Sequence, residues 1–166
     1  MRNSSNISSY QIHFPDLDLS EDDLSDGGFT YLNVSIFDHW LTKGEAEDSR
    51  IISYSIARSS GKIDEYMEGE KKFLELYRSL SKRGVICNRP RPLRRLDIAD
   101  EELDRIFLNS LREQGSMDVY FMSHGARVLG RYDRTDLFII EDAACLSTLK
   151  EEIAEAGLFI LHSDNV

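Results

Sequence analysis

The stretch "MDVYFMSHGARVLGRYDRTDLFIIED", residues 117–142, decides the fold because it holds two or three strands and the turns between them. Short runs rich in Val, Ile, Phe and Tyr, bounded by Gly and Asp, are typical of strands joined by turns. Gly125 supplies one turn and residues 133–136 supply the other. The stretch therefore predicts adjoining strands connected by short turns.

Three further strands are predicted outside this stretch. Apolar residues alternate with polar ones in "FTYLNVSIF", residues 29–37, and in "RIISYSIAR", residues 50–58, which is the pattern of half-buried strands. The second of these could pair with the first as a hairpin, across a polar connection. A last strand is predicted at "LFILH", residues 158–162.

Helical periodicity predicts three helices. The first runs from Lys62 to Arg83 and stops at Gly84. A second helix follows Asp97 or Asp100 and extends to about Gln114. A third, short helix begins at Asp142 and ends at Gly157. The prolines within residues 85–96 exclude a helix between the first two.

These elements predict an α+β fold, with mixed α/β as the alternative, in which a mainly antiparallel sheet packs against two or three helices. The chain has 166 residues, a length that suits one domain. Residues 1–28 are predicted to be an acidic, mostly irregular lead-in, and residues 29–166 a single globular domain. Gly27 and Gly28 mark the break between them.

The charge of the chain is strongly acidic and unevenly distributed. Its formal net charge is −10, which disfavours direct binding to nucleic acid or to an anionic membrane and favours a basic partner. Residues 1–50 hold ten acids and three bases, whereas residues 51–98 hold six acids and eleven bases. Within the first block, "FPDLDLSEDDLSDGG", residues 14–28, holds six carboxylates and no base. Its interspersed leucines would suit a recognition segment, and a loosely packed lead-in is the alternative.

The compartment is predicted to be the cytoplasm. The N-terminal stretch lacks the apolar run of a signal peptide, and no segment is long enough to cross a bilayer. Cys87 and Cys145 match no metal or redox spacing, so we expect two free thiols. The oligomeric state does not follow from the sequence.

No recognisable catalytic or phosphate-binding motif is present, and no cofactor or metal is predicted. One enzymatic alternative remains, a metal-dependent phosphodiesterase or nuclease centred on Asp133, Asp136 and His124. Against it, Asp136 and Glu141 lie five residues apart on one predicted strand and so point to opposite faces.

The basic stretch of residues 78–95 has seven Lys or Arg residues and no acid. It supports a second alternative, a small regulatory adaptor that binds nucleic acid. The stretch lacks interleaved aromatic residues, so we favour a solvated connector that neutralises nearby acids of its own fold.

Residues 131–164, "RYDRTDLFIIED" followed by an amphipathic helix and "GLFILHSD", resemble the C-terminal part of small bacterial domains. Some of these domains are immunity proteins encoded beside polymorphic toxins, including those of contact-dependent growth inhibition. The resemblance implies a cytoplasmic protein that neutralises a cognate toxin by binding it. The toxins of such systems are often nucleases.

The sequence therefore predicts an interaction protein, an immunity protein that inhibits a basic toxin domain without catalysis. Carboxylates on two segments are the expected partner contacts. They are Asp16, Asp18, Glu21, Asp22, Asp23 and Asp26 in the lead-in, and then Asp133, Asp136, Glu141 and Asp142.

Overall fold

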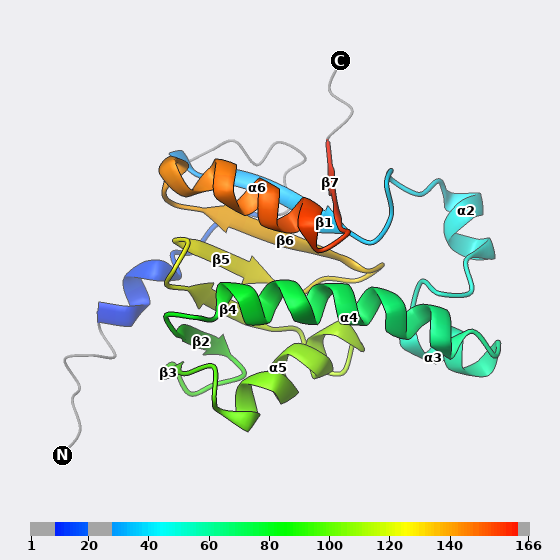
Figure 1. The fold of residues 1–166 in the computed structure, drawn as a ribbon, viewed down its shortest axis with the longest axis horizontal. Helices are drawn as coiled ribbons and strands as arrows, with labels where there is room; N and C mark the ends of the chain where they lie inside the picture. Colours follow the sequence, from blue (N-terminus) through cyan, green and yellow to red (C-terminus); the bar gives the residue numbers. More distant parts are fainter. Residues whose placement is uncertain (1–8, 20–27, 163–166) are drawn as a thin grey trace.

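The computed structural model describes residues 9–19 and 28–162 of the chain. Over these residues a seven-stranded sheet, with the strand order β3-β2-β4-β5-β6-β1-β7, forms one layer and three helices form the other (Figure 1). The strands are β1 (Thr30–Ser35), β2 (Val85–Arg89), β3 (Arg94–Leu96), β4 (Asp118–Phe121), β5 (Ala126–Leu129), β6 (Thr135–Ile140) and β7 (Phe159–Leu161). The helices of the second layer are α4 (Ile63–Leu80), α5 (Glu101–Leu111) and α6 (Leu146–Glu155).

Every strand pairing is antiparallel, which confirms the predicted single-domain α+β fold. Residues 117–142 form β4, β5 and β6. The first turn contains Gly125 at φ +58°, and the second places Asp133 and Arg134 at φ +60° and +57°. Asp tolerates this left-handed region better than most side chains. The Asp at position 133 is therefore a suitable residue for the predicted turn.

The main core lies between the sheet and the three helices. Tyr77 of α4 is fully buried, and its ring contacts Phe107 of α5 and two phenylalanines of the sheet, Phe121 and Phe138. Burial of an aromatic or aliphatic side chain of this size stabilises a fold by about 1.5–3 kcal/mol. The aromatic contacts therefore fix α4 and α5 on the sheet.

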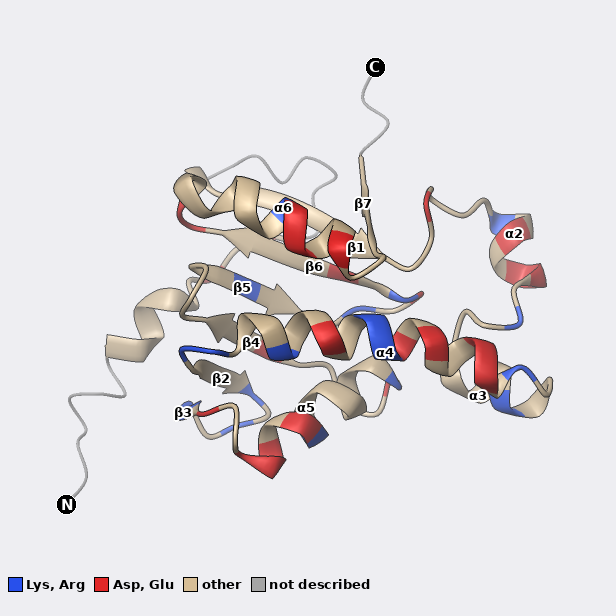
Figure 2. Ribbon diagram, in the orientation of Figure 1, with Lys and Arg blue, Asp and Glu red and all other residues tan. Residues whose placement is uncertain are grey.

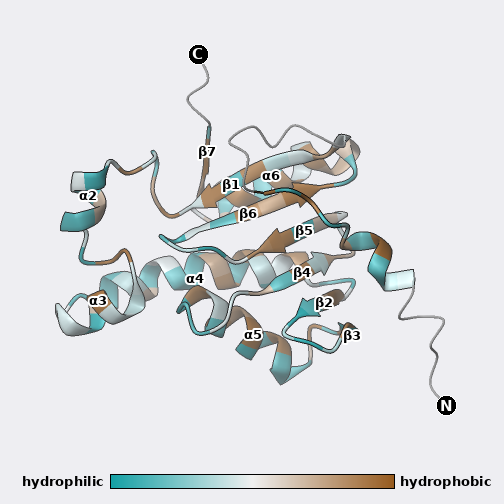
Figure 3. Ribbon diagram, turned by 180° about the vertical axis from the view of Figure 1, so that it is seen from behind, coloured by the Kyte–Doolittle hydropathy of each residue, from teal (hydrophilic) through white to brown (hydrophobic). Residues whose placement is uncertain are grey.

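The opposite face of the sheet is covered by no helix of the described residues, and Figure 3 shows its strands in front of the helices. Residues 14–19 lie against this face instead. Phe14 packs with Ile86 and Tyr120 in one buried cluster, and Leu17 and Leu19 pack on a second cluster formed by Leu129, Leu137 and Ile139. A 3-10 turn, η1 (Gln11–His13), precedes this segment. The described part of the predicted lead-in is thus packed on the domain.

The prediction of a strand at residues 50–58 is wrong. Residues Tyr54–Ser59 form helix α3, which begins after Ser53 because its Oγ accepts a hydrogen bond from the N–H of Ile56 at 3.3 Å. The buried Ala57 faces the interior from this helix. The neighbours of β1 are β6 and β7, so the predicted hairpin between residues 29–37 and 50–58 does not form.

The predicted polar connection before residue 50 contains a second short helix, α2 (Lys43–Asp48). Thr42 and Glu45 close a capping box at its N-terminus. Together α2 and α3 form an arm that projects beyond the sheet, at the right of Figure 1. Within the described residues, no helix has the combined length and apolarity needed to cross a bilayer.

Candidate functional site

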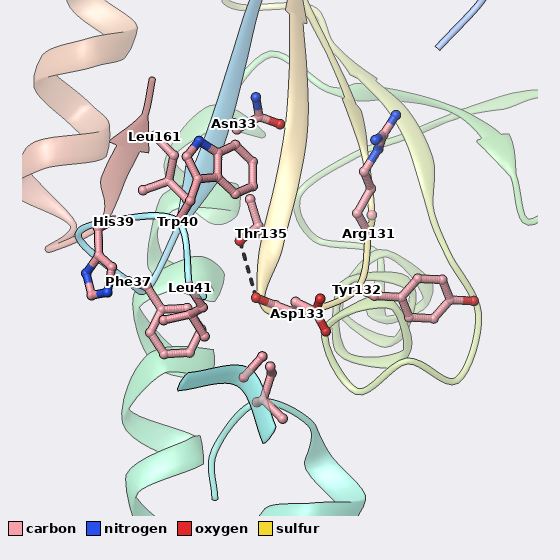
Figure 4. A pocket seen from close by; sticks show the side chains of 13 residues that line it. Asn33, Phe37, His39, Trp40, Leu41, Arg131, Tyr132, Asp133, Thr135 and Leu161 are labelled. Atoms are coloured by element: carbon pink, nitrogen blue, oxygen red, sulfur yellow. Dashed lines mark hydrogen bonds between the residues drawn. The ribbon is translucent and has the colours of Figure 1, made fainter. Parts of the chain in front are cut away.

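A cleft of about 510 Å³ lies where the arm meets the helix-free face of the sheet near β1, β6 and β7. In Figure 4, Phe37, Trp40 and Leu41 stand on one side and Arg131 and Tyr132 on the other. Most of the lining surface is apolar. A cleft of this size with a few polar groups is typical of a binding site.

Strand pairing brings the two sides of the cleft together. Ser35 of β1 lies opposite Thr135 of β6, and the Oγ1 of Thr135 donates a hydrogen bond to the Oγ of Ser35 at 2.8 Å. Asn33 lies opposite Leu161 of β7. The loop that follows β1 and the loop that precedes β6 are therefore neighbours, although about a hundred residues separate them in the sequence.

Buried Arg134 holds the second loop in place. Its Nη2 donates to the carbonyl of Tyr66 at 2.8 Å, its Nη1 donates to the carbonyl of Ile51 at 3.3 Å, and its guanidinium lies 3.8 Å from the centroid of the Tyr66 ring. Burial lowers the pKa of Arg134 from its ordinary value, but arginine keeps its charge in proteins. The anchored loop leaves the Tyr132 side chain 73% exposed at the outer rim.

The arm side of the cleft is also fixed by hydrogen bonds. The Nε1 of Trp40 donates to the carbonyl of His162 at 2.8 Å, while the side chain stays 44% exposed. His39 lies 2.6 Å from a carboxylate oxygen of Asp38 and 2.6 Å from one of Glu45. These two carboxylates raise the pKa of His39. His39 therefore holds the loop to the start of α2.

Carboxylates outnumber bases around the cleft. Figure 2 shows acidic residues on α2 and on the adjoining end of α4. The exposed acids of the cleft and arm are Asp38, Glu45, Glu47, Asp48 and Asp133, and the exposed bases are Lys43, Arg50, Arg58 and Arg131. Asp133 lies between the two walls of the cleft (Figure 4). The cleft thus combines apolar walls with one central carboxylate.

The structure separates the predicted contact residues into several places. Asp16 and Asp18 are exposed on the segment that crosses the sheet, and Asp133 is exposed at the cleft. Glu141 accepts a hydrogen bond from the Tyr120 hydroxyl at 2.9 Å at the far end of β6. Asp142 accepts one from the N–H of Ala144 at 2.9 Å and so caps η3 (Ala143–Cys145). Glu21, Asp22, Asp23 and Asp26 lie outside the described residues.

The prediction that Asp136 contacts a partner is wrong, because its side chain is buried in the domain. Asp136 is 4% exposed. Its Oδ2 accepts a hydrogen bond from the Tyr77 hydroxyl, and its Oδ1 accepts one from the N–H of Arg131 at 3.0 Å. Burial raises the pKa of Asp136 to about 6. Its role is to connect α4 with the loop that lines the cleft.

The constellation of Asp133, Asp136 and His124 does not assemble. His124 lies in the turn between β4 and β5, whereas the two aspartates lie at the other end of β5 and β6. The Nε2 of His124 is 2.6 Å from a carboxylate oxygen of Glu152 on α6. In the described ranges, no three His, Cys, Asp or Glu residues could hold a metal ion together. The three residues named for the phosphodiesterase alternative therefore do not form one site.

Part of the basic stretch of residues 78–95 is paired with acids of the same fold. Arg78 lies 3.2 Å from Asp104, Arg94 is paired with Glu102, and Arg95 lies 3.7 Å from Asp97. The prediction of a solvated connector is wrong, because residues 85–89 and 94–96 form β2 and β3, and Val85, Ile86 and Cys87 are buried. Burial raises the pKa of the Cys87 thiol to about 11, so the thiol is protonated at neutral pH and is not activated.

Trp40 and Tyr132 were not predicted as site residues. Trp40 lies in the polar connection between two predicted elements, where a large aromatic side chain has no core to enter, and Tyr132 directly precedes the turn predicted at residues 133–136. An aromatic residue in such a position is the signal that could have identified them.

Comparison of the chain with protein-family models, with curated proteins and with solved structures finds no match.

Proposed function

We propose that this protein is an immunity protein that binds and neutralises a cognate toxin domain of the nuclease class and catalyses no reaction of its own. The observation that carries the proposal is the cleft, where exposed Trp40 stands beside apolar walls and a central carboxylate. Residues that dominate protein interfaces are enriched in Trp, Tyr and Arg and occupy desolvated pockets. The cleft offers one such pocket.

The chemistry of the cleft favours a lysine or arginine of the partner as its occupant. The apolar walls formed by Phe37 and Leu41 suit the methylene stem of a long basic side chain. Asp133 can pair with the charged group at the end of that stem. The exposed face of Trp40 can add a cation–π contact, which is worth about 0.5–2 kcal/mol.

The charge of the whole molecule supports the same kind of partner. A net charge of −10 attracts a protein with a basic surface and accelerates their encounter. A nuclease domain carries such a surface, because it must neutralise phosphates of its substrate. In the proposal, the protein acts in the bacterial cytoplasm, where a toxin of contact-dependent growth inhibition would reach its target.

Replacing Trp40 with alanine is expected to weaken binding of the cognate toxin about 30-fold, since loss of an interface anchor costs about 2 kcal/mol. The cognate toxin is to be sought as a basic toxin-like domain in a neighbouring reading frame, and isothermal titration calorimetry gives the dissociation constant. Ile98→Ala is the matched control, because Ile98 is 49% exposed and lies before α5, away from the cleft. Equal affinities of the two variants, both folded by circular dichroism, would place the interface elsewhere.

Neutralising the six carboxylates of residues 14–28 to Asn or Gln is expected to slow association with the toxin about 10-fold at low salt and to flatten its salt dependence. Stopped-flow fluorescence measures the association rate. A control with the same net charge neutralises six exposed glutamates on the helices: Glu65, Glu68, Glu75, Glu101, Glu151 and Glu155. If the control slows association equally, net charge alone steers the encounter. An unchanged rate for the first variant would remove residues 14–28 from the steering surface.

A further inference from the structure

A second hollow, of about 720 Å³, lies on the helix-free face of the sheet between the 9–19 segment and the end of β2. Gln11, Phe14, Pro15 and Asp16 line one side, and Asn88, Arg89, Arg91 and Arg127 line the other. We call it the arginine groove. It shares no lining residue with the cleft, although Asp16 at its edge also belongs to the acidic run expected to steer the toxin.

Arg127 is held rigidly at the base of the arginine groove. Its Nε and Nη2 donate to the two carboxylate oxygens of Asp118 at 2.8 and 2.9 Å, and Asp118 is fully buried. Its Nη1 donates to the carbonyl of Pro15 at 2.9 Å, and its guanidinium lies 5.3 Å from the centroid of the Phe14 ring. These contacts fix the orientation of the guanidinium before any ligand arrives.

Asp118 cannot neutralise the arginines around it. Its Oδ2 also accepts a hydrogen bond from the Nδ2 of Asn88 at 2.9 Å. The same oxygen lies 3.9 Å from the Nη2 of Arg89. One buried carboxylate therefore faces two guanidinium groups. Arg91 adds a third, and it has no ion pair with any residue in the described ranges.

Arg89 ends β2 and Arg91 lies in the loop that follows, and the backbone of both residues is restricted. Each arginine directly precedes a proline, and a residue before proline is confined to extended conformations.

Asp16 is the second acid at the groove. Three arginines and two aspartates leave a positive excess at the groove, in a molecule whose net charge is −10. The groove therefore suits a negatively charged ligand, whereas the cleft suits a positively charged one.

We propose that the arginine groove binds a small, multiply charged oxyanion ligand of the phosphate class. Guanidinium groups hold phosphate oxygens through paired, charge-assisted hydrogen bonds. The volume of the groove lies in the range of about 300–1,000 Å³ that small-molecule sites occupy. Arg89 and Arg91 contact the ligand directly, and Arg127 forms the base of the site.

Calorimetric titration of the full chain with inorganic pyrophosphate at low ionic strength tests this proposal. The double variant Arg89→Gln/Arg91→Gln is expected to bind at least about 10-fold more weakly. The matched control is Arg58→Gln/Arg105→Gln, which removes the same charge from exposed positions on α3 and α5 and should bind as the wild type does. Asp16→Asn is expected to tighten binding about 3-fold, whereas Asp64→Asn, on α4, should leave it unchanged.

Three results would overturn the proposal: no heat of binding for pyrophosphate, equal weakening by the two arginine pairs, or tighter binding of citrate than of pyrophosphate. The last would assign the groove to carboxylates. Because the groove and the cleft share no residue, failure here leaves the immunity proposal intact, and loss of toxin binding by Trp40→Ala leaves the arginine groove intact.

Discussion

Replacing Asp118 with alanine is expected to lower the free energy of unfolding by about 3–5 kcal/mol, because it leaves the charge of Arg127 buried without its partner. Asp118 is fully buried, and Arg127 is 8% exposed. The substitution removes two charge-assisted hydrogen bonds from Arg127 and the acceptor of the Asn88 amide. Urea denaturation monitored by circular dichroism measures the loss.

The pair on the surface, Arg78 and Asp104, provides the control. Its side chains are 51% and 46% exposed, and exposed pairs of this kind contribute about 0–1 kcal/mol. Asp104→Ala should therefore change stability little. The double variant Asp118→Ala/Arg127→Met should recover part of the loss, because no unpaired charge remains buried. A loss below about 1 kcal/mol for Asp118→Ala would show that water reaches Arg127.

The sequence predicts the sheet well where local pattern and tertiary pairing agree. Residues 117–142 contain both their strands and their turns, so neighbours in the sequence are neighbours in the sheet. The helix predicted at 62–83 forms as α4, at residues 63–80, because its apolar residues repeat with the helical period. Both predictions need no information from elsewhere in the chain.

The strand predicted at residues 50–58 fails for a local reason. The alternation of apolar and polar residues in this segment fits a strand. The segment is so short, however, that the same pattern also fits a turn followed by a short helix. Ser53 resolves the competition by capping the N-terminus of α3. β1 has no free edge for the predicted hairpin partner, because β6 and β7 occupy both of its sides.

The cleft could not be predicted from the sequence because its two walls belong to distant loops. Trp40 follows β1 and Tyr132 precedes β6, and the pairing of those two strands decides that they meet. The sequence shows which residues are acidic, but it does not show which of their side chains are exposed. Asp133 and Asp136 are three residues apart, yet one lies in the cleft and the other in the core.

The buried Asp136 makes stability depend on pH, with an effect of about 3 kcal/mol. Burial raises its pKa from the model-compound value of 3.8 to about 6, so the folded state favours the protonated carboxyl. Its contribution to stability is complete below pH 3.8 and is lost as the pH rises through 6. Asp136→Asn removes the ionisation, so wild type should lose about 3 kcal/mol relative to this variant between acidic and neutral pH. Urea unfolding at a series of pH values measures the difference.

Tyr77→Phe tests the cause of this pH dependence. The Tyr77 hydroxyl donates to Asp136 and lowers the pKa of the carboxyl against the effect of burial. Without that donor the pKa should rise further, and the loss of stability should extend to higher pH. The same carboxyl also accepts the N–H of Arg131, a residue of the cleft, so ionisation of Asp136 acts on the loop that shapes the proposed toxin site. Parallel pH profiles for wild type and Asp136→Asn would show instead that this carboxyl has the same pKa in the folded and unfolded chain, and hence that the interior beside Tyr77 is hydrated.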